Sequence, residues 1–155
     1  MWSDCGVDAI ASPAQQAVRL PGRTMVVRHR ASSGETSVFI HGLGGSSLNW
    51  TDLIAEFGDR LDSYAVDLGG FGGSPPPRDG DFTPGGQARG VAEFIEHLAR
   101  GPVHVFGNSL GGAVAVQLAA RRPDLVRTLT LISPALPRLV PTRDTVQLPL
   151  LAIPG

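Results

Sequence analysis

Short apolar runs alternate with amphipathic segments along most of the chain. Runs with strand character cover residues 17–20, 23–30, 37–42, 62–66, 102–107 and 126–133. Apolar residues at helical spacing predict helices over residues 47–57, 84–100 and 110–122. Strands that alternate with helices pair in parallel through right-handed crossovers. The pattern therefore predicts an α/β fold with a doubly wound, mostly parallel sheet.

Two of the predicted helices have recognisable starts. Ser47 is the expected N-cap of the helix over residues 47–57, and Thr83 followed by Pro84 predicts the cap and first turn of the next helix. The apolar face of the first of these helices consists of Trp50, Leu53, Ile54 and Phe57. The segment DLGGFGGSPPPRDGDF, which precedes Thr83, is rich in Gly and Pro and is expected to be a loop.

The domain boundaries follow from where this pattern starts and stops. Residues 1–16 have no convincing period and are expected to form a loose N-terminal arm. Residues 17–133 are expected to belong to one domain, because a chain of this length buries roughly 68 to 70% of its extended surface, enough for one core. Prolines interrupt residues 134–155, which are expected to lead towards a cap or a missing C-terminal part.

Composition and charge exclude several classes of function. The formal net charge is -1 and all 13 basic residues are Arg, so neither nucleic acid nor a membrane surface is an expected partner. The lack of Lys excludes a P-loop nucleotide site and Schiff-base chemistry. A single Cys5, no signal peptide and no long apolar run favour a cytoplasmic protein. No metal-ligand spacing is found, and no cofactor is expected.

The strongest chemical motif is Gly107-Asn108-Ser109-Leu110-Gly111, a Gly-x-Ser-x-Gly between a predicted strand and a predicted helix. A turn tight enough to expose the central Ser above the sheet is strained and needs Gly on both sides. The motif makes Ser109 the candidate nucleophile. The alternative is a Gly-rich turn with no chemical role.

A second Gly-rich segment, His41-Gly42-Leu43-Gly44-Gly45, lies at the carboxyl end of the third predicted strand. A serine nucleophile needs N–H donors for the oxyanion that forms on attack. The expected pair is the backbone N–H of Leu43 and that of Leu110. A dinucleotide-type Gly-x-Gly-x-x-Gly is excluded, because Ser47 and Pro75 occupy its last position in the two registers that start with Gly-x-Gly.

The other titratable residues are not expected to be catalytic. His41 belongs to the oxyanion loop and is expected to stabilise it. Asp67 precedes the nucleophile in a Gly-rich loop and is expected to be structural. His29 and His104 lie in predicted strands, and His97 lies near a helix C-terminus, where a cation is mildly favoured.

Taken in chain order, three motifs resemble those of the α/β-hydrolase superfamily. They are HGLGG with Trp50 nine residues after the His, DLGGFGGS, and GNSLGG. The resemblance covers residues 17–133 and implies a hydrolase of a small-molecule acyl substrate: a carboxylic ester, thioester or lactone. Hydrolysis of a carbon-carbon bond is the alternative that GNSLGG also fits. Ser109 excludes the branches with an Asp nucleophile, such as epoxide hydrolases.

The chain departs from the family after Ser109. The family triad continues with Asp or Glu and then His, whereas here only Asp124 and Asp144 follow, and about six of the family's eight strands are present. Three interpretations stay open: a fragment that is inactive alone, one half of an enzyme completed by another chain, and a noncatalytic binding module. In a fragment, the strand at 126–133 would be an unpaired apolar edge, which favours oligomerisation.

Overall fold

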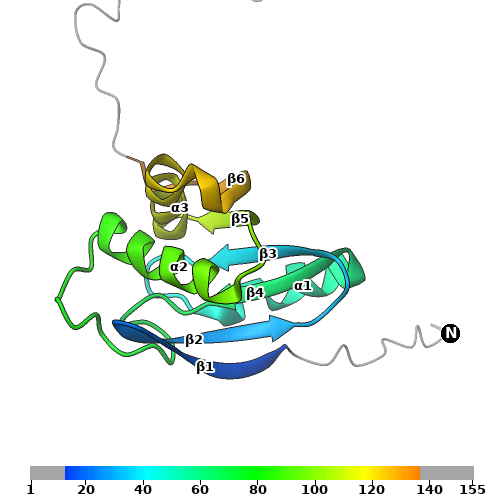
Figure 1. Cartoon of the computed structure of the whole chain (residues 1–155), viewed down its shortest axis with the longest axis horizontal. Coiled ribbons are helices and arrows are strands. Elements are labelled where there is room, and N and C mark those ends of the chain that lie inside the picture. Colours follow the sequence, from blue (N-terminus) through cyan, green and yellow to red (C-terminus); the bar gives the residue numbers. More distant parts are fainter. Residues whose placement is uncertain (1–12, 137–155) are drawn as a thin grey trace, which may run out of the picture.

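The computed structural model describes residues 13–136, which form a six-stranded sheet with helices on both faces (Figure 1). The strands are β1 (Ala14–Leu20), β2 (Arg23–Arg30), β3 (Glu35–Ile40), β4 (Leu61–Val66), β5 (Val103–Asn108) and β6 (Val126–Ile132). Their order across the sheet is β1-β2-β4-β3-β5-β6. The strands from β3 to β6 are parallel to one another, whereas β2 is antiparallel to both of its neighbours. The predicted α/β fold with a mostly parallel sheet is confirmed.

Three α-helices and three short 3-10 segments connect these strands. They are η1 (Ser47–Trp50), α1 (Thr51–Phe57), η2 (Gly58–Arg60), α2 (Pro84–Leu98), α3 (Leu110–Arg121) and η3 (Pro123–Leu125). In Figure 1, α2 and α3 lie over one face of the sheet and α1 lies behind it. Within the described residues, no helix combines the length and hydrophobicity needed to cross a membrane.

Alternate residues of the parallel strands face two separate apolar clusters. Val38 and Ile40 of β3 belong to the larger cluster, which α2 and α3 cover, whereas Phe39 between them belongs to a smaller cluster under α1. The smaller cluster also contains Trp50 and Ile54, with Leu53 and Phe57 packed against it. This confirms the apolar face expected for residues 47–57. Strands buried on both faces read as continuous apolar runs, as β3 does.

The structure confirms one of the two expected N-cap residues and corrects the other. Thr83 caps α2 as expected, since its hydroxyl accepts a hydrogen bond from the Gly86 N–H at 3.1 Å. The expectation for Ser47 was wrong, because Ser46 is the cap of η1: its hydroxyl accepts from the Leu48 N–H, and its own N–H donates to Asn49 Oδ1 at 2.8 Å. The pairing of Ser46 with an Asn three residues later forms a capping box.

Several boundaries differ from those expected. β1 begins at Ala14, three residues inside the expected arm, because its pairing with β2 continues to Ala14 opposite His29. α2 ends at Leu98 rather than at residue 100, since Ala99 adopts a left-handed conformation with φ of 52°. Residues 1–12 of the expected arm and most of the proline-rich segment lie outside the described residues.

β6 forms one edge of the sheet within the described part of the chain. Three of its apolar residues are partly exposed: the exposed fraction is 37% for Leu129, 36% for Leu131 and 39% for Ile132. Val105 of the adjacent β5 is fully buried. An apolar edge strand with free backbone groups is a surface that recruits other strands.

Candidate active site

Ser109 stands at a sharp turn between β5 and α3, with φ of 50° and ψ of -115°. A positive φ is unusual for a residue with a side chain and marks a strained position. Both glycines of the motif are needed here. A Cβ on Gly107 would lie 2.5 Å from the carbonyl oxygen of Gly111, and a Cβ on Gly111 would overlap the carbonyl oxygens of Ile40 and His41.

Hydrogen bonds on the backbone of Ser109 hold this turn against the end of β6. The Ser109 N–H donates to the carbonyl oxygen of Ile132 at 3.1 Å, and the Ser109 carbonyl oxygen accepts from the Ala135 N–H at 2.9 Å. The side chain of Ser109 is half-buried. Its hydroxyl has no hydrogen-bond partner among residues 13–136.

The segment of residues 41–45, the oxyanion loop, lies directly against this turn. A Cβ on Gly42 would be 3.2 Å from the Cβ of Ser109, so only a small residue permits this approach. The next residue is Leu43, and the residue after Ser109 is Leu110, the first of α3. The backbone N–H groups of Leu43 and Leu110 have no partner in the described part of the chain. For Leu110 this is usual, because the first N–H groups of a helix have no intrahelical acceptor. The structure thus brings together the three residues selected from the sequence.

His41 is fully buried at the start of the oxyanion loop, and both of its ring nitrogens are engaged. Nδ1 lies 2.7 Å from the carbonyl oxygen of Gly42, and Nε2 accepts a hydrogen bond from the Leu68 N–H at 3.0 Å. Because Nε2 accepts, the proton of the neutral ring is on Nδ1. Burial disfavours the imidazolium and lowers the pKa of His41. His41 therefore stabilises the loop, as expected, and offers no free nitrogen to a substrate.

Asp67 lies at the end of β4 and is almost fully buried. Its Oδ1 accepts a hydrogen bond from the Ser47 N–H at 2.6 Å, and its Oδ2 accepts one from the Gly73 N–H at 2.8 Å. The Asp67 carbonyl oxygen accepts a further bond from the Ser74 hydroxyl at 2.7 Å. Asp67 therefore has the structural role expected from the sequence. Its hydrogen bonds join the segment that begins η1 to the Gly-rich loop after β4.

Two of the remaining histidines have hydrogen-bond partners other than Ser109, and the third is exposed. His104 lies at the amino end of β5. Its Nε2 is 2.9 Å from Glu35 Oε2, and its Nδ1 is 2.7 Å from the hydroxyl oxygen of Thr128. Because a strand rises about 3.3 Å per residue, roughly 16 Å separates the backbones of His104 and Ser109. His29 binds Asp62 at 2.7 Å, and His97 is exposed near the end of α2. None of the four histidines of the chain is hydrogen-bonded to Ser109.

The two carboxylates that follow Ser109 do not complete a triad in the described structure. Asp124 lies in η3, before β6 begins, and pairs with Arg122 at 2.7 Å. This position is at the amino edge of the parallel strands, whereas Ser109 is at their carboxyl edge. Asp144 lies outside the described residues. Within residues 13–136, no group of His, Cys, Asp and Glu side chains could hold a metal ion.

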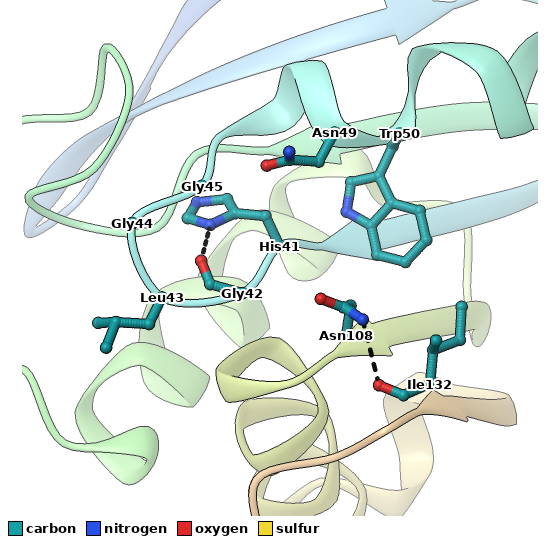
Figure 2. Close-up of a pocket in the computed structure, with 9 residues that line it drawn as sticks. All are labelled: His41, Gly42, Leu43, Gly44, Gly45, Asn49, Trp50, Asn108 and Ile132. Carbon is teal, nitrogen blue, oxygen red and sulfur yellow. Dashed lines mark hydrogen bonds between the residues drawn. The ribbon is translucent and has the colours of Figure 1, made fainter.

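A cavity of about 470 Å³ opens beside the oxyanion loop (Figure 2). The loop forms one wall, and the other walls come from Asn49, Trp50, Asn108 and Ile132. The sequence did not identify these last four as site residues. The sequence pattern assigned Trp50 to the apolar face of a helix. The structure confirms that its ring packs in the smaller apolar cluster, but the apolar pattern did not account for its polar N–H group.

Proteins of one fold family are similar to this chain. The family model described as alpha/beta hydrolase fold matches residues 38–154. A probable lysophospholipase, BODYGUARD 4 of Arabidopsis thaliana, is 34% identical over 86% of this chain and 34% of its own length. The esterase Rv0045c of Mycobacterium tuberculosis is 32% identical over 79% of this chain and 41% of its own length.

Among solved structures, a membrane phospholipase A described as a bacterial virulence factor has a TM-score of 0.76 and 32% identity. That match covers 81% of this chain and 41% of the phospholipase chain. The protein thus spans between a third and about two fifths of the length of these curated relatives. The chain belongs to the alpha/beta hydrolase fold family.

Proposed function

We propose that this chain supplies the nucleophile and the oxyanion donors of a hydrolase that cleaves a carboxylic ester, a thioester or a lactone. The observation that carries the proposal is the strained Ser109, with Gly42 of the oxyanion loop against its Cβ. In this reaction, Ser109 Oγ attacks the carbonyl carbon, and its proton passes to a general base. The oxyanion that forms accepts hydrogen bonds from the N–H groups of Leu43 and Leu110.

The first half of the reaction ends in an acyl-serine, and the second half restores the serine. The tetrahedral intermediate expels the alcohol or thiol, which takes up the proton held by the base, and an acyl-serine is left. Water then gives a proton to the base as it attacks the acyl-serine, and the base returns that proton to Ser109 Oγ as the carboxylic acid is released. Both halves need a base within hydrogen-bond reach of Ser109, and no histidine of this chain supports that role. We infer that the base and its acid partner belong to a part of the protein beyond this chain, and that the chain alone turns over poorly.

The relatives favour an ester as the bond that is cleaved. An esterase, a probable lysophospholipase and a phospholipase A are named among them. A carbon-carbon bond hydrolase is the alternative, because the GNSLGG turn fits that branch as well. A noncatalytic module that binds a ligand above Ser109 is the second alternative. A serine-directed reagent tests whether Ser109 is the reactive serine of this chain.

The test is covalent labelling with a fluorophosphonate, followed by peptide mass spectrometry. We expect the label on the peptide that contains Ser109, at a low rate because the base is missing, and no label on that peptide in Ser109→Ala. Ser133→Ala is the matched control, because Ser133 is exposed, lies after the end of β6 and also has a positive φ, of 43°. Labelling at another Ser that persists in Ser109→Ala would contradict the assignment.

A further inference from the structure

The cavity beside the oxyanion loop contains a hydrogen-bond donor that the described residues do not satisfy. Trp50 is 4% exposed, and its indole Nε1 is buried without a partner within residues 13–136. Figure 2 shows this nitrogen on the side of the ring that faces the oxyanion loop. A buried Trp N–H usually has a partner, because an unpaired buried donor is costly. Trp50 is one of the residues that line the cavity.

Two amide side chains add defined polar groups to the same walls. Asn49 Oδ1 accepts from the Ser46 N–H, so its Nδ2 faces outward as a donor. Asn108 Nδ2 donates to the carbonyl oxygen of Ile132 at 3.3 Å. Its Oδ1 is therefore left on the side of Gly42, where a Cβ would lie 3.1 Å from it. Asn49 and Trp50, which both line the cavity, thus each carry a side-chain N–H group without a partner among the described residues.

No residue that lines the cavity carries a formal charge. His41 is neutral, because burial lowers its pKa, and both of its nitrogens are engaged. The other lining residues are Gly, Leu, Ile, Asn and Trp. An anion that entered would lose hydration without gaining a cationic partner, whereas an uncharged carbonyl loses much less. The donors and the missing charge together select a neutral hydrogen-bond acceptor.

We propose that the indole N–H of Trp50, with the Asn49 amide beside it, binds an uncharged carbonyl oxygen of the substrate, remote from the bond that Ser109 attacks. This deepens the proposed function, because it gives the substrate a second carbonyl group, of an ester or amide, in addition to the reacting one. Its identification as a substrate group rests on that function. The binding of a carbonyl oxygen by Trp50 does not depend on the proposed function. It is therefore measured in Ser109→Ala, where no acyl transfer to residue 109 can occur.

The test follows the indole N–H of Trp50 by NMR. The chain contains only Trp2 and Trp50, so Trp2→Phe combined with Ser109→Ala leaves one indole resonance. The probe is N-ethylbutanamide, whose carbonyl is neutral, and butanoate is the charged match. We expect the amide to move the indole N–H resonance downfield in a saturable way, and butanoate to leave it in place. An unmoved resonance at saturating amide, or an equal shift with butanoate, would overturn the proposal.

A substitution at Trp50 measures the contribution of the donor. Trp50→Phe keeps an aromatic ring against Phe39, with which Trp50 packs at 5.4 Å between ring centroids, but removes the N–H. We expect the dissociation constant for N-ethylbutanamide, followed through backbone amide shifts, to rise about 2- to 12-fold, as for the loss of one hydrogen bond. An unchanged dissociation constant would contradict a role for the indole. If Trp50→Phe does not fold, the resonance of the unsubstituted Trp50 still decides the question.

Discussion

The carboxylate of Asp67, at the end of β4, accepts a hydrogen bond from the Ser47 N–H at 2.6 Å. Ser47 begins η1, two residues after the last Gly of the oxyanion loop. The same carboxylate accepts from the Gly73 N–H. A single buried acid therefore fixes where the oxyanion loop ends and where the Gly-rich loop after β4 turns. Asp67 lies in the region of the site but supports its backbone rather than the reaction.

We predict that Asp67→Asn lowers the free energy of unfolding by about 2 kcal/mol, because an amide presents one acceptor and leaves a buried N–H unpaired. Urea unfolding followed by circular dichroism measures the change. Asp52→Asn is the matched control, since Asp52 is exposed in the first turn of α1 and should change stability by less than about 0.5 kcal/mol. Equal effects of the two substitutions would contradict the role of Asp67.

The buried His41 should make stability depend on pH. Its pKa in the folded protein is below the ordinary value of 6.5, so the unfolded chain takes up a proton on this ring as the pH falls through that value, while the folded chain does not. The free energy of unfolding then falls between pH 7.5 and 5. We predict that stability falls less steeply with pH in His41→Gln than in the wild type. The Tm of both proteins, measured between pH 7.5 and 5, tests this. His97→Gln, at an exposed position, should keep the wild-type slope.

The two glycines around Ser109 should be intolerant of any side chain. Gly107→Ala places a Cβ 2.5 Å from a backbone oxygen that cannot move without distorting α3. We predict a loss of about 1 to 3 kcal/mol in the free energy of unfolding, as for an overpacked core. Gly22→Ala is the control, because a Cβ there meets no atom within 4 Å. A Gly107→Ala chain as stable as Gly22→Ala would show that the turn is not under this constraint.

We propose that the isolated chain associates with itself through the edge of β6, where Leu129, Leu131 and Ile132 are partly exposed. Charged side chains on an edge strand oppose strand pairing. Leu131→Lys should therefore lower the weight-average sedimentation coefficient at a given concentration. Leu48→Lys is the control, because Leu48 is 56% exposed and lies on η1 rather than on the edge. A monomeric wild-type chain at high concentration would refute the proposal.

The sequence predicted most elements of this fold because each has a period or a punctuating residue of its own. The continuous apolar run of β3 and the Thr83-Pro84 start of α2 are local properties, and the structure confirms both. The start of β1 at Ala14 was missed, because residues such as Gln15 and Gln16 become a strand only through pairing with β2. The cap at Ser46 was missed for a similar reason, since either of two adjacent serines suits the position.

The site was predictable to the extent that it follows from short motifs. Ser109, Leu43 and Leu110 come from two Gly-rich segments that the sheet topology brings to one edge. The cavity was not predictable, because Asn49, Trp50 and Asn108 come from separate elements, and their apolar or capping roles conceal the polar groups that are left over. The engagement of both His41 nitrogens also depends on Leu68, which lies 27 positions away.

Hydrolysis of p-nitrophenyl butanoate by the purified 155-residue chain tests the central claim most directly: that Ser109 is the nucleophile and its base lies outside this chain. We predict a slow, residual rate, of the order of 10³ to 10⁴ over the uncatalysed reaction at most, with Ser109→Ala as the comparison. A turnover number of about 1 to 10³ s⁻¹, as for a complete enzyme, that is lost in Ser109→Ala would contradict the claim and place a working base within these residues.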